Sequence, residues 1–404
     1  MATRLKIAQL AREVDDVLRL RHQVYVIEDG KFGGEPLPEG RIIDRFDAMP
    51  FVANIIAYHE GAPIGTIRIV KQTDAGLPTE EFLDFSNYKE TVERKFNKPI
   101  FASAGMLAIT HDGRKRRDVI MALFKMATGV CMSWGVTHVV ANANHETTSV
   151  YEHLGFEQLA EKSWAPSINN YIVPMACPLD KPIAWAFSNL IDHQLDTFWL
   201  DNFSGEFERV LLSPNEVLFN QGDDADAVYI VDDGWISIIR TDEEGQELNL
   251  AKLSKGALFG ELAMIDEISR SATASSPTHT DVIRISKVDF QRAIRKDTDS
   301  VDKLLRIFAK RLRSADELAM VMAYAPQTGR VKFALNKLRE DAIPHRKQSN
   351  VLVAKGGPKE VAKVAGVREY EVRRILEMEK QSGELAYSDR WIHFFIQEPQ
   401  TKIA

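Results

Sequence analysis

The chain has 404 residues, of which 45% are hydrophobic and 27% are charged, and its formal net charge at pH 7 is −7. This length predicts about three domains, and the composition is typical of a soluble multidomain protein without internal repeats or low-complexity tracts. No apolar run is long enough to span a membrane, and the charged residues after Met1 exclude a signal peptide there, so we expect a cytoplasmic protein. Cys131 and Cys177 lack the spacing of metal ligands, so we expect buried free thiols and no metal site.

Three motifs in the first 180 residues set charged residues among apolar ones, at Leu18–Glu28, Asp44–Asp47 and Gly65–Ile69. These motifs resemble those of autoinducer synthases and N-acyl amino acid synthases. The resemblance implies a fold of the GCN5-related (GNAT) type, an acyl carrier protein as the donor of the acyl chain, and no glycine-rich coenzyme loop. The charged residues that it implies for the acceptor site are Arg21, Glu28, Asp44, Asp47 and Arg68. The alternative is a structural network of ion pairs between the first helix and the sheet.

The apolar segment Ala104–Thr110 fits the central strand of such a sheet, and Arg114–Phe124 fits the loop and helix after it. In the common GNAT pattern this loop carries glycines that bind the coenzyme A pyrophosphate, and here Asp118 and Ile120 take their places. The consecutive basic residues 114–117 could still hold a phosphate or an acidic carrier surface, and the alternative is a solvated basic turn. The residues implied for binding the acyl donor, an acyl carrier protein or coenzyme A thioester, are Leu107, Ile109, Arg114, Arg116, Arg117 and Asn144.

The segment Val139–Phe156 resembles the end of a GNAT acyltransferase, with a strand, an asparagine, a short helix and a Leu-Gly-Phe turn. The resemblance implies that Tyr151 protonates the departing thiolate, a role that suits a weak acid, while the alternative is a ring that packs the helix on the sheet. The implied reaction is acyl transfer from a thioester to an amine, with an oxyanion held by backbone N–H of the central strand. Glu28 or Asp47 would accept the amine proton, and no metal is required.

Three prolines between 174 and 182 indicate the end of this first domain, and 183–205 is typical of an amphipathic connecting helix. We therefore predict a GNAT-like domain over 1–180 and a helical connector over 181–205. A ligand-binding domain with a dimerisation helix is expected over 206–325, followed by a last domain over 326–404.

The run Phe259–Thr273 combines residue types that suit a cyclic phosphate ester. A glycine allows close backbone approach, a carboxylate can accept a ribose hydroxyl, backbone N–H groups open a helix, and an arginine offers a planar fork of donors. This run resembles the phosphate-binding cassette of cyclic-nucleotide-binding domains, and the short flanking strands favour a β-jelly roll. The alternative is an ordinary hairpin with a surface arginine. The implied site for cAMP or cGMP consists of Gly260, Glu261, Leu262, Ala263, Arg270 and Ser271.

Apolar residues after this domain recur at alternating spacings of four and three, which is a heptad pattern. They are Val301, Leu305, Phe308, Leu312, Ala315, Ala319 and Met322. This pattern favours a homodimer, whereas the alternative is a helix that lies on its own barrel. Regulators of the catabolite-activator (Crp/Fnr) type carry an equivalent helix, and the resemblance to them extends to the C-terminus.

Segments Lys359–Val367 and Arg368–Leu376 resemble a helix-turn-helix, and the residues after them resemble a wing hairpin. This end of the chain has an excess of Lys and Arg, which favours contact with DNA phosphates. The DNA-binding residues implied are Lys359, Arg373 and Arg374. Glu369 and Glu371 would repel phosphates, so a winged helix that serves as a regulatory or protein-binding module stays an open alternative.

The sequence therefore predicts an α+β multidomain protein: a mixed sheet with helices, a β-jelly roll with a long dimer helix, and a winged helix-turn-helix. The leading functional hypothesis is an N-acyltransferase regulated by a cyclic nucleotide. The alternative is a cyclic-nucleotide-responsive transcription regulator whose N-terminal domain senses an acyl ligand.

Overall fold

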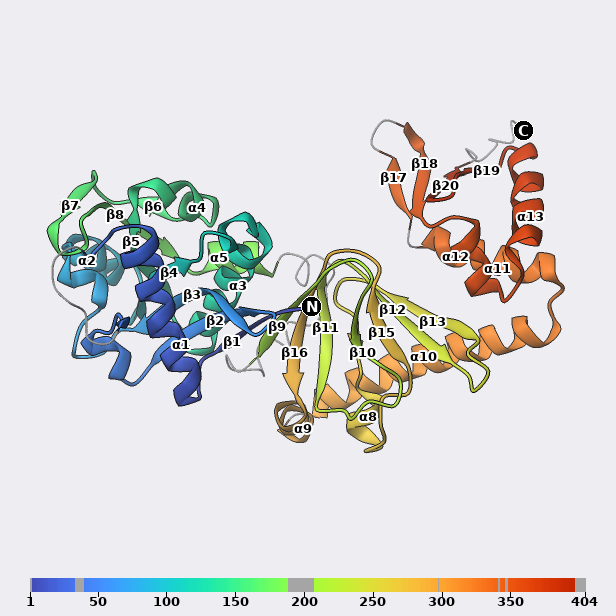
Figure 1. The fold of residues 1–404 in the computed structure, drawn as a ribbon, viewed down its shortest axis with the longest axis horizontal. Helices are drawn as coiled ribbons and strands as arrows, with labels where there is room; N and C mark the ends of the chain where they lie inside the picture. Colours follow the sequence, from blue (N-terminus) through green and yellow to red (C-terminus); the bar gives the residue numbers. More distant parts are fainter. Residues whose placement is uncertain are drawn as a thin grey trace. The chain divides into compact units, whose positions relative to one another are not determined.

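A computed structural model describes residues 2–32, 40–187, 207–296, 298–340, 342–345 and 348–396. Most of the predicted connector over 181–205 lies outside these residues. The chain forms two compact units, one of 1–236 with 253–296 and one of 237–252 with 297–404. The predicted fold class is confirmed, because the described residues combine a large mixed sheet, a β-jelly-roll region and helices (Figure 1).

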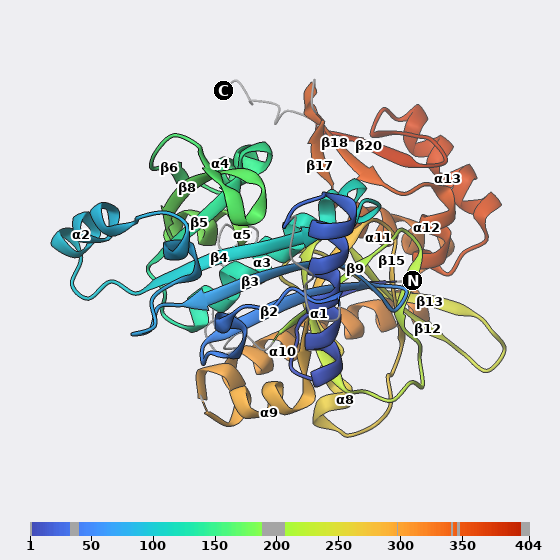
Figure 2. The same cartoon turned by 60° about the vertical axis from the view of Figure 1, so that its left-hand side comes forward.

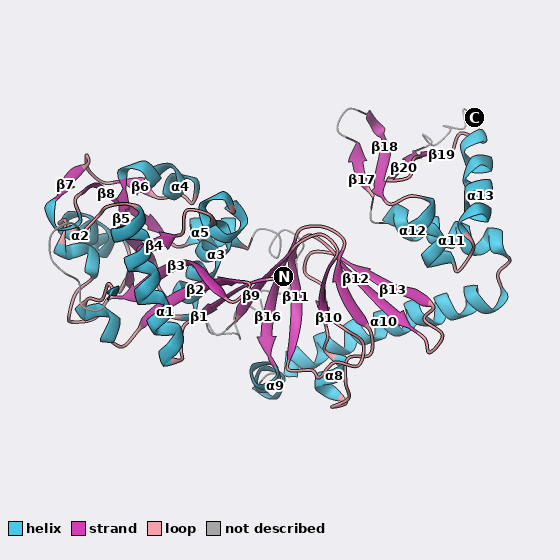
Figure 3. Cartoon of the chain, viewed as in Figure 1, coloured by secondary structure: helices cyan, strands magenta, loops and turns pink. Residues whose placement is uncertain are grey.

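The first 187 residues supply a mixed sheet with helices packed against it (Figure 3). Its strands are β1 (Thr3–Ile7), β2 (Val52–His59), β3 (Ala62–Lys71), β4 (Phe101–Ile109), β5 (His138–Asn144), β6 (Glu157–Gln158), β7 (Ser163–Ala165) and β8 (Asn170–Pro178). Its α-helices are α1 (Ala11–His22), α2 (Ser86–Lys95), α3 (Arg117–Ser133), α4 (Thr148–His153) and α5 (Asp180–Ala186). Short 3-10 turns and the π-helical segment η1 (Gln23–Glu28) also belong to the described part of this region.

The central strands of this sheet are covered on both faces. Consecutive residues Ile55 and Ile56 of β2 point to opposite faces, and both are fully buried. Helices α1 and α3 both pack against β2, β3 and β4, which places charged residues of α1 beside the sheet (Figure 2).

Strand β4 has an irregularity at the place where the sequence predicts the acyl site. Its pairing with β3 shifts register between Thr66 and Arg68, and Met106 has a left-handed φ of 51°. Strand β4 pairs with β5 in parallel only over Phe101–Ala104. Both strands continue beyond this pairing, so they separate toward their carboxyl ends and leave the β4 backbone without a β5 partner there.

A second group of strands joins the same sheet from the predicted nucleotide-binding domain. The sheet runs β14-β11-β16-β9-β1-β2-β3-β4-β5-β8-β6, with β7 paired to β8. The elements of this region are β9 (Glu208–Leu212), β10 (Glu216–Phe219), β11 (Ala227–Asp233), β14 (Leu258–Phe259), α8 (Leu262–Ile265), β15 (Thr273–Ser276), β16 (Thr280–Ser286) and α9 (Lys287–Lys296). The two predicted domains are therefore continuous in one twelve-stranded sheet, which sequence periodicity did not predict.

The second unit contains the long helix and the C-terminal elements. Its elements are β12 (Ile236–Thr241), β13 (Glu247–Leu253), α10 (Thr298–Tyr324), α11 (Gln327–Glu340), β17 (Ile343–His345), β18 (Gln348–Lys355), α12 (Pro358–Ala365), α13 (Glu369–Gln381), β19 (Leu385–Tyr387) and β20 (Trp391–Phe395). Gly366 has a φ of 58° and forms the tight turn between α12 and α13. A core of apolar residues from α11, α12, α13 and the β17-β18-β20-β19 sheet holds these elements together.

Candidate functional site

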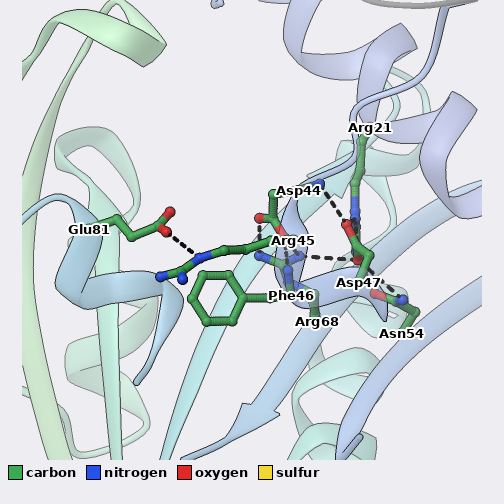
Figure 4. A network of polar contacts seen from close by, with 8 residues as sticks. All are labelled: Arg21, Asp44, Arg45, Phe46, Asp47, Asn54, Arg68 and Glu81. Atoms are coloured by element: carbon green, nitrogen blue, oxygen red, sulfur yellow. Dashed lines mark hydrogen bonds and ion pairs between the residues drawn. The ribbon is translucent and has the colours of Figure 1, made fainter. Parts of the chain in front are cut away.

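The charged residues predicted for the acceptor site meet in one buried network on α1, β2, β3 and the turn before β2 (Figure 4). Arg21 is fully buried and donates through Nη1 to both carboxylate oxygens of Asp47, at 2.9 and 3.0 Å. Arg68 donates to Asp44 at 2.7 and 2.6 Å and lies 3.1 Å from Asp47 Oδ1. Asn54 accepts a hydrogen bond from Arg21 and donates to Asp47 at 3.4 Å. The structure thus brings together four of the predicted acceptor-site residues.

Local backbone geometry fixes the two carboxylates of this network. Asp44 precedes the 3-10 turn η3 (Arg45–Ala48) and accepts a hydrogen bond from Phe46 N at 2.9 Å. The N–H of Asp44 donates in return to Asp47 Oδ2 at 3.2 Å, so the motif caps its own turn. Both carboxylates of this motif therefore have a structural role, because they cap the turn and pair with two arginines.

The electrostatics make Asp47 a weak base. Burial alone would raise the pKa of Asp47, but the guanidinium groups of Arg21 and Arg68 outweigh this effect and hold the pKa below its ordinary value. Its carboxylate already accepts from two arginines, an asparagine amide and a backbone N–H. The Asp47 carboxylate is therefore ionised at neutral pH, and its protonation would weaken the ion pairs with Arg21 and Arg68.

Glu28 has different surroundings from Asp47. It ends the π-helical segment η1, a kind of irregularity that is frequent at functional sites. Its Oε2 accepts from the backbone N–H of His111 at 2.8 Å and lies 3.8 Å from Arg114 Nη2. The Glu28 side chain is 19% exposed, so water reaches it beside the loop that follows β4.

The β4–α3 loop satisfies most of its N–H groups internally. Gly113 N donates to Thr110 Oγ1 at 3.1 Å, and Arg114 N donates to the Thr110 carbonyl at 2.9 Å. The N–H groups of Lys115 and Arg116 donate to carbonyls of the same loop, at 3.3 and 2.9 Å. These groups are therefore unavailable as a cradle for a pyrophosphate.

Three of the basic side chains in this loop are paired with carboxylates. Lys115 Nζ donates to Asp112 Oδ1 at 2.8 Å. Arg114 Nη2 donates to Asp29 Oδ1 at 2.6 Å, and Arg116 Nη2 donates to Asp118 Oδ2 at 2.7 Å. Arg117, at the first position of α3, is exposed. The carboxylates of Asp29 and Asp118 therefore neutralise two of the basic side chains of this loop.

Tyr151 belongs to α4, and its side chain is buried, with 3% of its surface exposed. Its ring makes T-shaped contacts with the rings of Phe124 and Phe156, with centroids 5.5 and 5.3 Å apart. Burial raises the pKa of Tyr151 to about 12, so the phenol keeps its proton at neutral pH. The Tyr151 ring can therefore pack against its aromatic neighbours while its phenol keeps a proton to donate.

Other predicted donor-site residues lie on the separating strands. Leu107 is half-buried in the β4 irregularity and Ile109 is buried at the end of β4. Asn144 ends β5, and its side-chain oxygen accepts from Asn170 Nδ2 at 3.1 Å.

Sequence reasoning missed Asn54 and also Tyr25, whose hydroxyl donates to the Leu107 carbonyl at 2.8 Å. A polar residue within the apolar strand segment 52–57 was the available signal for Asn54.

The predicted phosphate cassette converges on a buried arginine. Arg270 is 3% exposed and donates through Nη1 to the Gly260 carbonyl at 2.8 Å and through Nη2 to the Ala227 carbonyl at 2.6 Å. Its guanidinium lies over the Phe219 ring, 4.2 Å from the centroid. Gly260 has a φ of 78°, and a Cβ there would lie 2.6 Å from Arg270 Nη1, so only glycine fits.

The remaining cassette residues differ in burial. Glu261 and Ala263 are buried at the start of α8, whereas Leu262 is exposed. Ser271 is exposed, although the residues on either side of it in sequence are buried. Backbone amides at the start of α8 and the guanidinium of Arg270 are the donors that this region can offer to a phosphate.

The basic residues predicted for DNA contact are partly neutralised by their neighbours. On α13, Arg373 Nη2 donates to Glu369 and to Asp389, both at 2.7 Å. Arg374 Nε donates to Glu371 at 3.0 Å, while Lys359 is exposed on α12. Glutamates of the same helix thus hold both arginines at its surface.

Within 2–32, 40–187, 207–296, 298–340, 342–345 and 348–396, no group of three or more His, Cys, Asp or Glu residues is placed to hold a metal ion. Among the same described residues, no helix is both long and apolar enough to cross a membrane.

Comparison with known proteins identifies two regions. Residues 16–178 match the family model described as N-acyl amino acid synthase FeeM, and residues 209–297 match the model of the cyclic nucleotide-binding domain. The chain is 32% identical over 177 residues to the cyclic AMP receptor protein of Thermus thermophilus. This alignment covers 44% of this chain and 79% of that protein. It is 30% identical over 164 residues to the cAMP-activated global transcriptional regulator CRP of Salmonella typhimurium, covering 40% and 77%. The solved structure of FeeM from uncultured soil microbes aligns with a TM-score of 0.36 and 18% identity, covering 44% of this chain and 91% of that one.

Proposed function

Since the chain belongs to the family of the cyclic AMP receptor proteins and also carries an N-acyl amino acid synthase domain, we propose that it is an N-acyltransferase regulated by a cyclic nucleotide. The observation that carries this proposal is the continuity of the two domains in one sheet, where strand β1 of the first pairs with strand β9 of the second. Two domains that share a sheet have a physical means of affecting one another.

The reaction in this proposal is the GNAT-type transfer of an acyl group from a thioester to the amino group of an amino acid. The amine attacks the thioester carbonyl, a C–N bond forms and the C–S bond breaks. Backbone N–H groups of β4 beyond its pairing with β5, near Leu107, stabilise the oxyanion. The thiolate leaves with the proton of Tyr151, and water returns that proton afterwards.

Glu28 is the proposed acceptor of the amine proton, acting through water. It is water-accessible beside the end of β4, whereas Asp47 is buried and held by two arginines. Asp47, Arg21, Asp44 and Arg68 then shape the acceptor side of the site and hold α1 on the sheet. The positions of these residues support both an acceptor-site role and a structural role for the network.

The proposed donor is a thioester on an acyl carrier protein. The β4–α3 loop uses its N–H groups internally, and carboxylates pair with Arg114 and Arg116, so a coenzyme pyrophosphate gains little there. A carrier protein presents its single phosphodiester and an acidic surface, which the exposed Arg117 would meet.

The proposed effector is cAMP or cGMP, bound through Arg270 and the start of α8. The proposed assembly is a homodimer through α10, because its heptad residues Leu305 and Leu312 are 57% and 64% exposed. Large apolar side chains in a regular heptad row favour a second helix as their partner.

The second candidate function is a nucleotide-responsive transcription regulator with an acyl-sensing domain. Helices α12 and α13 with the β19–β20 hairpin favour it, because they have the order of a winged helix. The pairing of Arg373 and Arg374 with glutamates counts against phosphate contact by these two residues.

A search for a new amide separates the two functions. Purified full-length protein is incubated with acyl carrier protein thioesters or coenzyme A thioesters, the twenty amino acids, and cAMP or cGMP. Mass spectrometry then detects N-acyl amino acids. A new amide formed by the wild type, and formed more slowly by Tyr151→Phe, supports the enzyme. Absence of any amide with every donor, together with nucleotide-dependent DNA binding, favours the regulator.

A further inference from the structure

The two domains of the first unit are joined edge to edge by main-chain pairing. Strand β1 runs antiparallel to β9, with Thr3 opposite Leu211, Arg4 opposite Val210 and Leu5 opposite Arg209. Strand β9 pairs in turn with β16, and β16 pairs with β11. Backbone pairing is therefore continuous from β11 through β16 and β9 to β1 of the transferase sheet (Figure 1).

A buried group of four charged residues lies at this junction. We call it the junction cluster: Lys125 of α3, Arg209 of β9, Asp232 of β11 and Asp281 of β16. Lys125 Nζ lies 2.5 Å from Asp232 Oδ2 and 3.6 Å from Asp281 Oδ2. Arg209 Nη1 donates to Asp232 at 2.8 Å and to Asp281 at 2.6 Å.

Two cations balance two carboxylates in the junction cluster, and the side chains of Arg209 and Asp232 are completely buried. Lys125 is the member that belongs to the transferase domain. Removing one partner from a buried ion pair leaves an uncompensated charge, so the positions of α3 and β11 are strongly tied to each other.

Helix α3 contacts the nucleotide-binding region at a second point on the same face. Gly129, one turn after Lys125, packs against the ring of Phe207, and a Cβ at Gly129 would lie 2.4 Å from Phe207 Cζ. Phe207 is 5% exposed and directly precedes β9. The face of α3 that carries Lys125 and Gly129 is thus fitted to the nucleotide-binding region.

Strand β11 connects the junction cluster with the phosphate cassette. Its first residue, Ala227, accepts a hydrogen bond from Arg270 Nη2 at 2.6 Å, and its sixth residue is Asp232. The pairing of β11 with β16 shifts register between Val231 and Asp233, so Asp232 lies at an irregularity of the strand. Strand β11 therefore contacts Arg270, the residue predicted to bind the phosphate, near one end. Near its other end it contacts Lys125 of α3.

We propose that cyclic-nucleotide binding controls acyl transfer through strand β11 and the ion pair of Asp232 with Lys125. The proposal rests on the proposed function above. When a cyclic phosphate binds, the Arg270 guanidinium turns its donors from the Ala227 carbonyl to the phosphate oxygens. The end of β11 loses this bond and shifts, Asp232 moves with it, and Lys125 carries the movement into α3. Because the β4–α3 loop leads into α3, the donor side of the transferase site responds.

Hydrogen–deuterium exchange on the full chain tests this route without requiring turnover. Exchange of the α3 amides, 117–133, is measured with and without saturating cAMP, and again with cGMP, in the wild type and in Lys125→Met. The control is Lys181→Met, which removes an exposed ion pair with Glu157 at the surface of the same domain. Phe207→Leu is a milder second variant at the same junction, and calorimetry confirms nucleotide binding in each protein.

The expected result is a nucleotide-dependent change in α3 exchange of at least about fivefold in the wild type and in Lys181→Met, the lower end of typical coupling between sites. The change should fall below twofold in Lys125→Met, which should still bind nucleotide, and should be reduced in Phe207→Leu. An equal change in Lys125→Met, or no change in a wild type that binds nucleotide, would overturn the route alone. Failure of the wild type to bind either nucleotide would overturn the regulatory part of the proposed function together with it.

Discussion

The hydroxyl of Tyr25 donates a hydrogen bond to the carbonyl oxygen of Leu107 at 2.8 Å. Tyr25 belongs to the π-helical segment η1, and Leu107 lies in the irregular part of β4 next to Met106, whose φ is 51°. A buried side chain from the N-terminal segment therefore fixes the backbone that the proposed mechanism uses for the oxyanion.

Tyr25→Phe should lower kcat about fivefold and change the KM of the donor little, because a typical hydrogen bond contributes about 1 kcal/mol. The ring of Phe would keep the contact with Phe32, so folding should persist. Tyr58→Phe is the matched control, because it removes a hydroxyl bonded to Asp16 on another part of the domain. Steady-state kinetics that leave kcat of Tyr25→Phe at the wild-type value would show that Leu107 needs no such support.

Tyr151→Phe should slow turnover by about 10²–10⁴-fold with little loss of donor binding, the usual effect of removing a general acid. Since burial raises the pKa of Tyr151 to about 12, the wild-type rate should show no decline from this group between pH 6 and about pH 10. Tyr171→Phe, at an exposed ring that meets Trp164 in a T-shaped contact, serves as the control. Unchanged turnover in Tyr151→Phe would assign this residue to packing.

Arg270→Ala should weaken cyclic-nucleotide binding by about 2–4 kcal/mol, in the range for truncating a buried charge partner. Arg270→Lys should recover only part of this loss, because an ammonium lacks the planar fork. Calorimetry with cAMP and cGMP measures both variants, with Arg292→Ala on the exposed surface of α9 as the control. Wild-type affinity in Arg270→Ala would contradict the cassette assignment.

Asp47→Asn should destabilise the protein at pH 7 by about 3–5 kcal/mol, because Arg21 and Arg68 lose a buried partner. The folded-state pKa of Asp47 lies below its unfolded value of about 3.9, so its stabilisation is complete above that value. It is lost as the pH falls through the lower folded-state pKa.

Denaturant unfolding at a series of pH values measures this difference between wild type and Asp47→Asn. The gap should stay constant from pH 7 to about pH 5 and then narrow under more acidic conditions. Glu81→Gln, which removes an exposed pair with Arg45, should cost less than about 1 kcal/mol throughout. A gap that does not depend on pH would mean that the charge of Asp47 does not stabilise the network.

The sequence predicted local chemistry better than long-range pairing. The cassette run required Gly260 and Arg270 to lie close together, and in the structure Arg270 donates to the Gly260 carbonyl. The motif Asp44–Asp47 indicated charged groups near the sheet, and they form one network. In both cases short spacing along the chain and residue chemistry limit the possible arrangements.

The junction of β1 with β9 could not be predicted in the same way. The alternation of residues in Thr3–Ile7 indicates that one face of this strand is buried, but it does not indicate which strand pairs with its free edge. Lys125 within an apolar helix was a visible signal for a buried partner, yet Asp232 lies 107 residues away in sequence. Such pairs depend on the packing of whole domains.

The most direct test of the account is the rate of amide formation by the full-length protein with and without saturating cyclic nucleotide. The assay uses the acyl donor and amino acid found by mass spectrometry, and calorimetry establishes that the nucleotide is bound. The account predicts that cAMP or cGMP changes the rate by about 5-fold or more, the range of typical coupling between two sites. Identical rates with bound and absent nucleotide would contradict it, because the two domains would then share a sheet without sharing control.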